Sequence, residues 1–231
     1  MFKRFINLIL PVECGGCGGR VNPKKINGLC STCFKNIEVL NNNCCNYCGK
    51  PVKEGLTFCP KCWEMSSYTD RFLTACYYRG PIKNIIKNLK YKNRGYLANI
   101  LSEILFNRYS KIVKPEFDLI VPVPLHAGKL EKRGYNQAAL IAKNLSKKTK
   151  IPLANSIVKR VKTTKPQYQL TRKERIKNLK NAFRSTKILH GERVLLIDDV
   201  ATTGSTVQNC ASVIVKAGSG KVSALVIAHG K

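Results

Sequence analysis

The chain has 231 residues and a formal net charge of +28, because 41 Lys and Arg residues outnumber 13 Asp and Glu residues. This length suits one domain of moderate size together with a small module. Residues 5–10 form an early apolar stretch, but Asn7 interrupts it and Pro11 ends it, which excludes a signal peptide and a membrane-spanning helix there. We therefore expect a cytoplasmic protein.

The N-terminal part contains four Cys-x-x-Cys pairs, which are Cys14 and Cys17, Cys30 and Cys33, Cys45 and Cys48, and Cys59 and Cys62. In a cytosolic chain this spacing indicates metal ligands rather than reactive or disulfide-bonded cysteines, and two pairs supply one tetrahedral zinc site. We expect one or two structural zinc ions, with Cys44 as an alternative to Cys45. The spacing leaves open whether adjacent or alternate pairs share a metal. Cys76 and Cys210 have no partners nearby and are expected in the core.

The composition changes near residue 66, which divides the chain into a Cys-rich module at residues 1–66 and a larger domain at residues 67–231. Apolar periodicity predicts strands that alternate with helices in the larger domain. The predicted strands are residues 69–78, 117–123, 157–161, 194–197 and 222–228. The predicted helices are one that begins at Pro81, residues 96–113, 136–145 and 173–180, and one that follows residue 204 and stops at Gly218. This alternation indicates an α/β fold with a mostly parallel sheet flanked by helices.

Residues 194–206 carry the clearest chemical signal. The first four are apolar, as in a strand buried on both faces, and Asp198 and Asp199 follow at its carboxyl end. Residues 202–206 are small or hydroxylated, so their backbone N–H groups can surround a phosphate where a helix begins, with Ser205 and Thr206 as good N-cap residues. Carboxylates beside a phosphate loop suit a ribose 5-phosphate. An ordinary strand, turn and capped helix is the alternative.

Two further segments carry polar groups that suit the same ligand. Arg133, Asn136 and Gln137 offer several hydrogen-bond donors near a predicted helix start, although an exposed helix start would look the same. Residues 162–182 are polar, basic and long enough to move as a lid, with a solvated loop as the alternative. Candidate residues in this segment are Gln167, Arg172, Arg175 and Asn178.

The motif at residues 194–206 resembles the signature of type I phosphoribosyltransferases, a hydrophobic strand followed by two acids and a T-T-G-x-T type loop. The resemblance implies that Asp198 and Asp199 form the catalytic pair, which holds the ribose hydroxyls of phosphoribosyl pyrophosphate, and that this ligand comes with Mg²⁺. It also implies a pyrophosphate-binding loop after the strand near residue 121 and a lid at residues 162–182. The implied ligand-binding residues are Ala201, Thr202, Thr203, Gly204, Ser205, Thr206, Leu125, His126, Arg133, Asn136, Gln137, Gln167, Arg172 and Arg175.

The order of motifs along nearly the whole chain is similar to that of the ComF competence family. The matching segments are the cysteine pairs and residues 121–126, 133–137, 166–178, 182–183 and 194–206. The resemblance implies a type I phosphoribosyltransferase-like domain with a small N-terminal Cys-rich zinc-binding module. It also implies handling of incoming single-stranded DNA in naturally transformable bacteria, and it points to no particular acceptor for the ribose phosphate.

The positive charge is concentrated at residues 129–187, which hold eighteen Lys and Arg residues against two acids. This stretch, with Tyr135 and Tyr168 inside it, suits sequence-independent binding of a nucleic-acid backbone with some base stacking. Two alternatives would also explain this excess of positive charge. One is AT-rich coding, and the other is the local positive charge that a pyrophosphate site requires. Three hypotheses follow: an enzyme that transfers ribose phosphate, a non-catalytic single-stranded DNA adaptor, and a zinc module that docks a competence protein through an exposed patch of Trp63, Tyr47 and Phe58. The alternative for these three rings is that they pack around the metal.

Overall fold

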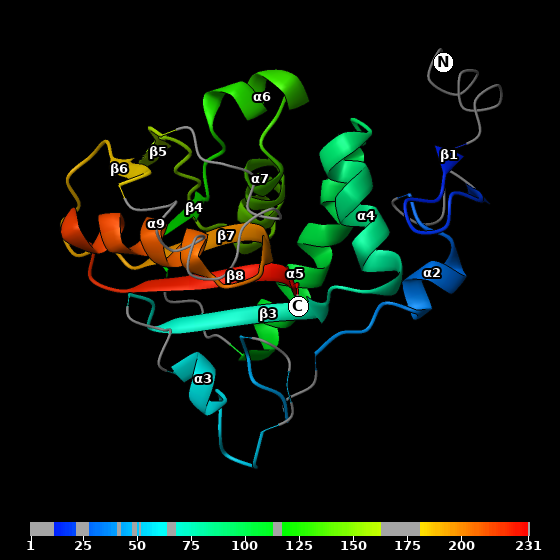
Figure 1. Cartoon of the computed structure of the whole chain (residues 1–231), viewed down its shortest axis with the longest axis horizontal. Coiled ribbons are helices and arrows are strands. Elements are labelled where there is room, and N and C mark those ends of the chain that lie inside the picture. The colour runs from blue at the N-terminus through cyan, green and yellow to red at the C-terminus, as the bar shows by residue number, and fades with distance from the viewer. Residues whose placement is uncertain are drawn as a thin grey trace.

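The structure, a computed structural model, describes residues 12–21, 28–40, 43–47, 50, 52–63, 68–112, 117–162 and 181–230. A parallel sheet in the order β3-β8-β7-β4 runs through the centre of the molecule (Figure 1). Its strands are β3 (Arg71–Tyr77), β4 (Leu119–Pro122), β7 (Val194–Ala201) and β8 (Val222–His229). The predicted mostly parallel sheet is therefore confirmed.

Helices cover both faces of this sheet (Figure 1). They are α4 (Gly80–Tyr91), α5 (Ala98–Ile112), α7 (Gln137–Thr149) and α9 (Ser205–Lys216), with a 3-10 turn, η1 (Gly95–Leu97), before α5. Leu195 and Ile197 of β7 belong to the core shared with α4, α5 and α7, whereas Val194 and Leu196 belong to the core shared with α9. Because successive side chains of a strand point to opposite faces, the apolar run of β7 fills both cores.

Two local elements differ from the sequence prediction. The strand predicted at residues 157–161 is β5 (Val158–Arg160), which pairs antiparallel with β6 (Phe183–Ser185) outside the main sheet. Val158 is buried and Lys159 exposed, so β5 has one covered face, which is typical of an antiparallel pair. An unpredicted helix, α6 (Ala127–Arg133), follows β4 and is capped by the His126 side chain. The helix predicted at residues 173–180 lies outside the described residues, and no helix within them is long and apolar enough to span a membrane.

The N-terminal cysteines gather into two clusters that follow the order of the sequence. The sulfur atoms of Cys14, Cys17, Cys30 and Cys33 lie within 4.8 Å of one another, and so do those of Cys45, Cys59 and Cys62. Adjacent pairs therefore come together, while Cys48 lies outside the described residues. Cys44 is 3.5 Å from the Tyr77 hydroxyl and is not part of the second cluster.

The first cluster has the hydrogen bonds that a zinc knuckle needs. The Gly16 and Cys30 amides donate to the Cys14 sulfur at 3.4 and 3.3 Å, and the Cys33 amide donates to the Cys30 sulfur at 3.3 Å. Burial acts to raise the pKa of the Cys14 thiol, but backbone donors outweigh it and lower the pKa to about 6. The donor set thus favours the thiolate form of Cys14, which is the form that binds Zn²⁺.

The two cysteine clusters contribute to different cores. The first lies beside β1 (Val12–Glu13), β2 (Arg20–Val21) and α2 (Ser31–Lys35), and its Cys14 and Cys33 join the core of α4 and α5. The second includes α3 (Pro60–Trp63), and its Cys45 and Cys62 join the core of α9. The boundary predicted between residues 66 and 67 lies outside the described residues. Cys76 and Cys210 are buried in the core, as predicted.

Tyr47 connects the second cysteine cluster to the loop before α9. Its side chain is only 1% exposed, and its ring centroid lies 4.1 Å from that of Phe72. Gly204 has a φ of +67°, and a Cβ atom at this position would overlap the Tyr47 hydroxyl. Of the two alternatives for Tyr47, the exposed aromatic patch is therefore wrong, whereas Trp63 is 72% exposed.

Gly204→Ala is expected to destabilise the protein more than Gly191→Ala does. Both glycines have positive φ, but Gly191 has open space around its Cβ position, so its substitution carries only the conformational cost of about 1–2 kcal/mol. At Gly204 the overlap with Tyr47 should add about 1–3 kcal/mol. Urea denaturation measures the free energy of unfolding of both variants. Equal values would show that Tyr47 moves aside freely.

Elemental analysis of the purified protein is expected to find two zinc ions per chain, one for each cysteine cluster. Cys17→Ser and Cys59→Ser should each lower the zinc content by about one, because a site with three thiolates binds zinc more weakly. Cys76→Ala is the control, since Cys76 lies in the core apart from both clusters. Loss of both ions from either cluster variant would contradict two independent sites.

Candidate functional site

A cavity of about 1050 Å³ lies at the carboxyl edge of the parallel sheet. Its walls come from the end of β7, the segment between β4 and α7, β5, the start of α9 and the end of α4. Ligand sites of open α/β sheets lie beyond the carboxyl ends of the strands, where connections diverge to opposite faces. The cavity is therefore the natural candidate for the functional site.

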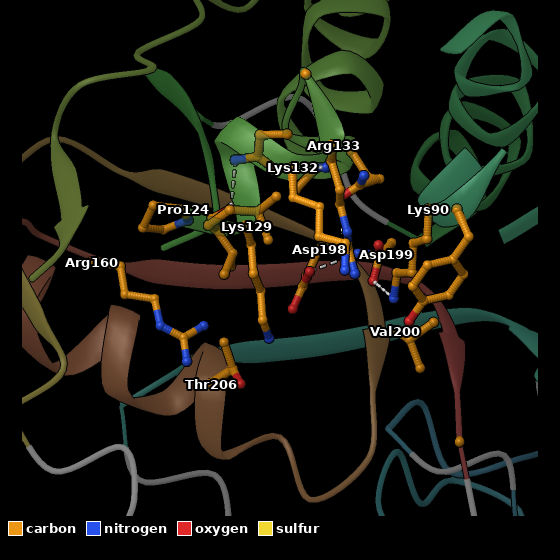
Figure 2. Close-up of a pocket in the computed structure, with 18 of the residues that line it drawn as sticks. Lys90, Pro124, Lys129, Lys132, Arg133, Arg160, Asp198, Asp199, Val200 and Thr206 are labelled. Carbon is orange, nitrogen blue, oxygen red and sulfur yellow. Dashed lines mark hydrogen bonds and ion pairs between the residues drawn. The ribbon is translucent and has the colours of Figure 1, made fainter. Parts of the chain in front are cut away.

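Asp198 and Asp199 form an acid pair in the wall of this cavity (Figure 2). They lie within β7, which continues four residues beyond the predicted strand end at Ile197. The Asp199 amide donates to the Asp198 carboxylate at 2.8 Å, and Asp199 is only 6% exposed. Burial and the neighbouring Asp199 charge raise the pKa of Asp198 to about 7, although Lys90 and Arg160 oppose this rise.

Lys90 lies beside the acid pair and was not predicted from the sequence. Its ammonium nitrogen is 2.7 Å from Oδ1 of Asp199 (Figure 2). Burial alone would lower the pKa of Lys90, but the two carboxylates raise it above its usual value. A signal was present in the sequence: Lys90 falls one turn after Ile86, on the face that buries Ile82 and Ile86.

Four more basic side chains line the cavity: Lys129, Lys132, Arg133 and Arg160. In Figure 2, Lys129 and Arg160 lie near Thr206, on the side of Asp198 opposite Lys90. Burial, followed by repulsion from Arg160, Arg133 and Lys90, lowers the pKa of Lys129. Because these positive groups repel one another, the cavity is suited to an anionic ligand.

The predicted residues before α7 shape the cavity wall. Arg133 donates to Oε1 of Gln137 at 3.0 Å, and its guanidinium lies 5.1 Å from the Tyr91 ring centroid. Asn136 is the N-cap of α7: it accepts from Ala138 and donates to the Val123 carbonyl, each at 3.0 Å. Asn136 thus connects the residue that follows β4 to the start of α7 through hydrogen bonds.

The loop from Thr202 to Gly204 connects β7 to α9. The Thr203 and Ser205 hydroxyls are 2.7 Å apart, and the Ser205 amide donates to the Thr203 hydroxyl at 3.4 Å. The N-cap of α9 is Gly204 in a left-handed conformation, not Ser205 or Thr206 as predicted. A glycine is needed because the turn approaches Tyr47 so closely.

The structure separates the predicted ligand-binding residues into three groups. In the cavity wall are Leu125, Arg133, Asn136, Gln137, Thr202 and Thr206. Beside the wall are His126, Ala201, Thr203, Gly204 and Ser205. Outside the described residues are Gln167, Arg172, Arg175 and Asn178. The sequence analysis missed Lys90, Lys129 and Arg160. Arg160 reaches the cavity because β5 pairs with β6 outside the main sheet, and local periodicity could not predict this pairing.

Comparison with known proteins gives matches to both parts of the chain. A family described as "Double zinc ribbon domain" matches residues 5–63, and one described as "Phosphoribosyl transferase domain" matches residues 130–231. Together with the two thiol clusters, the first match indicates structural zinc.

Full-length relatives carry names from DNA uptake and use. Competence protein F of Haemophilus influenzae is 36% identical over 89% of this chain and 92% of its own length. DNA utilization protein YhgH of Escherichia coli K12 is 31% identical over 84% of this chain and 87% of its own length. Competence protein ComFC of Bacillus subtilis is 25% identical over 82% of this chain and 79% of its own length. With its N-terminal double zinc ribbon and its phosphoribosyltransferase domain, the chain belongs to the ComF family of competence proteins.

Proposed function

We propose that the protein binds phosphoribosyl pyrophosphate with Mg²⁺ and acts in DNA uptake. The observation that carries this proposal is the cavity itself, which places an acid pair and a phosphate-sized loop against a cluster of cations. The names of the relatives support the role in DNA uptake. The Mg²⁺ ion enters as part of the ligand, bound to its pyrophosphate.

Each part of the ligand matches one part of the cavity. The ribose hydroxyls donate to the carboxylates of Asp198 and Asp199. The 5-phosphate accepts hydrogen bonds from the loop at residues 202–206, at the positive end of the α9 dipole. The pyrophosphate lies toward Lys129, Arg133 and Arg160, whose positive charges oppose its negative charge.

This arrangement suits transfer of the ribose phosphate to an acceptor. The bond between the anomeric carbon and pyrophosphate breaks, pyrophosphate leaves with the electron pair, and a nucleophilic acceptor atom bonds to the anomeric carbon. The cations near the pyrophosphate stabilise the charge that develops on the leaving group. We propose that residues 162–182, including Gln167, Arg172 and Arg175, close over the site and exclude water.

A non-catalytic single-stranded DNA adaptor is the second candidate function. It is favoured by the basic side chains of the cavity and by Tyr91, which is 70% exposed at the cavity wall. Cations that follow a backbone and aromatic rings that stack on bases are the usual elements of such binding. The docking of another competence protein on the second ribbon remains a further proposal, with exposed Trp63 and nearby Phe58 as its surface.

Calorimetric titration with Mg²⁺ and phosphoribosyl pyrophosphate is expected to show binding by the wild type. The variant Asp198→Asn/Asp199→Asn should bind at least about tenfold more weakly, because neutral amides are poorer acceptors than carboxylates for the ribose hydroxyls. Asp118→Asn is the control, since Asp118 pairs with Arg193 outside the cavity. Equal affinity of the double variant and the wild type would contradict a ribose-binding acid pair.

The triple variant Lys159→Gln/Arg184→Gln/Lys187→Gln tests the DNA proposal, because all three residues belong to the basic stretch 129–187 and are exposed on or beside the β5–β6 pair, outside the cavity. Single-stranded DNA binding, followed by fluorescence anisotropy, should weaken, and its salt dependence should fall by about 0.7 in log-log slope per lost phosphate contact. Binding of phosphoribosyl pyrophosphate should not change. Lys35→Gln/Lys83→Gln/Lys216→Gln removes the same charge from other exposed positions; equal weakening by this control would indicate a net-charge effect only.

A further inference from the structure

Lys90 reaches the cavity from a part of the chain that precedes the matched phosphoribosyltransferase segment, residues 130–231. It lies in the last turn of α4, and its side chain is 20% exposed. The neighbouring residues on this helix face, Ile86 and Leu89, are fully buried. The packing of α4 therefore directs the Lys90 ammonium toward the end of β7, where it meets Asp199 (Figure 2).

A buried acid pair needs a positive charge close to it. Asp198 and Asp199 are consecutive in β7, and removing two carboxylates from water is unfavourable unless charge or hydrogen bonds compensate. A divalent cation with oxygen ligands is one common solution. Here the Lys90 ammonium is 2.7 Å from Asp199 and supplies the compensating charge directly.

Other charged and titratable groups line the cavity or interact with the pair, and among them are Lys132 and Arg133 of α6. Arg160 of β5 and Lys129 of α6 face the Asp198 side of the cavity (Figure 2). Tyr78, just before α4, interacts with Lys90 and Asp199, and Cys210 of α9 interacts with Asp198. Lys90 makes the 2.7 Å ion pair with Asp199, whereas Lys129 and Arg160 lie toward Thr206 and the phosphate loop. Lys90 is therefore the basic group that pairs with the end of the cavity where the proposed ribose site lies.

We propose that Lys90 is a positioning residue for the acid pair, and that its ammonium replaces a metal ion at the ribose end of the cavity. This inference rests on the proposed function, because it assigns the charge balance of that same site. Ribose 5-phosphate, which has no pyrophosphate, then binds without a divalent cation. Mg²⁺ is needed only for the pyrophosphate of the full ligand.

Calorimetry with ribose 5-phosphate tests this directly. The wild type should bind it with equal affinity in Mg²⁺ and in EDTA. Lys90→Met should weaken binding about tenfold or more, while Lys90→Arg should keep most of it, because the arginine retains the charge. Lys87→Met is the matched control, since Lys87 is exposed one turn earlier on α4 and lies outside this cavity.

The pH dependence gives a second measurement that a purely structural role would not change. Ribose hydroxyls donate to ionised Asp198, so the affinity of the wild type should rise as the pH passes about 7, the raised pKa of Asp198. Lys90 lowers that pKa, so in Lys90→Met the rise should move upward by about one pH unit. If Lys90→Met does not fold, Lys90→Gln removes the same charge, keeps a polar side chain and permits the same titration.

The outcomes separate this inference from the proposed function. A wild type that requires Mg²⁺ for ribose 5-phosphate, or a Lys90→Met variant with unchanged affinity and pH profile, overturns the role of Lys90 while leaving the site intact. A wild type that binds neither ribose 5-phosphate nor phosphoribosyl pyrophosphate with Mg²⁺ overturns both.

Discussion

Two consecutive carboxylates inside a buried strand impose the constraint on which the rest of the site depends. Their repulsion and desolvation keep the pKa of Asp198 near 7, and the Lys90 ammonium 2.7 Å from Asp199 offsets part of this cost. For Lys90 to reach the pair, α4 must pack beside the carboxyl end of β7. The ion pair between Lys90 and Asp199 therefore links α4, in the N-terminal half of the domain, to the motif at residues 194–206.

The parallel register of the sheet determines which segments surround the acid pair. β7 lies between β4 and β8, with Pro122 paired to Ile197 and Asp198 paired to Val226. The segment after β4 and the loop after β7 consequently leave the sheet at the same edge. The cations of α6 and the acid pair of β7 then line the same cavity, which therefore has both a positive and a negative side.

The zinc ribbons act as parts of the cores, not as separate appendages. The first cysteine cluster packs with α4 and α5, the helices behind Lys90, and the second packs with α9, which follows the loop at residues 202–204. Tyr47 contacts the turn at Gly204 so closely that no side chain fits there. Each cysteine cluster thus supports one side of the cavity, so structural zinc bound there would bear directly on the geometry of the cavity.

The sequence alone determined features that depend on neighbouring residues: the strands and helices of the main sheet, the four thiol pairs, and the acid pair with its loop. Apolar periodicity and short motifs are local signals, so they can be identified in one chain. Only the tertiary structure decided which pairs of cysteines meet, that residues 158–160 leave the main sheet, and that Lys90 and Arg160 enter the cavity. These results depend on contacts between residues such as Lys90 and Asp199, which are more than one hundred positions apart, and a local pattern contains no information about such packing.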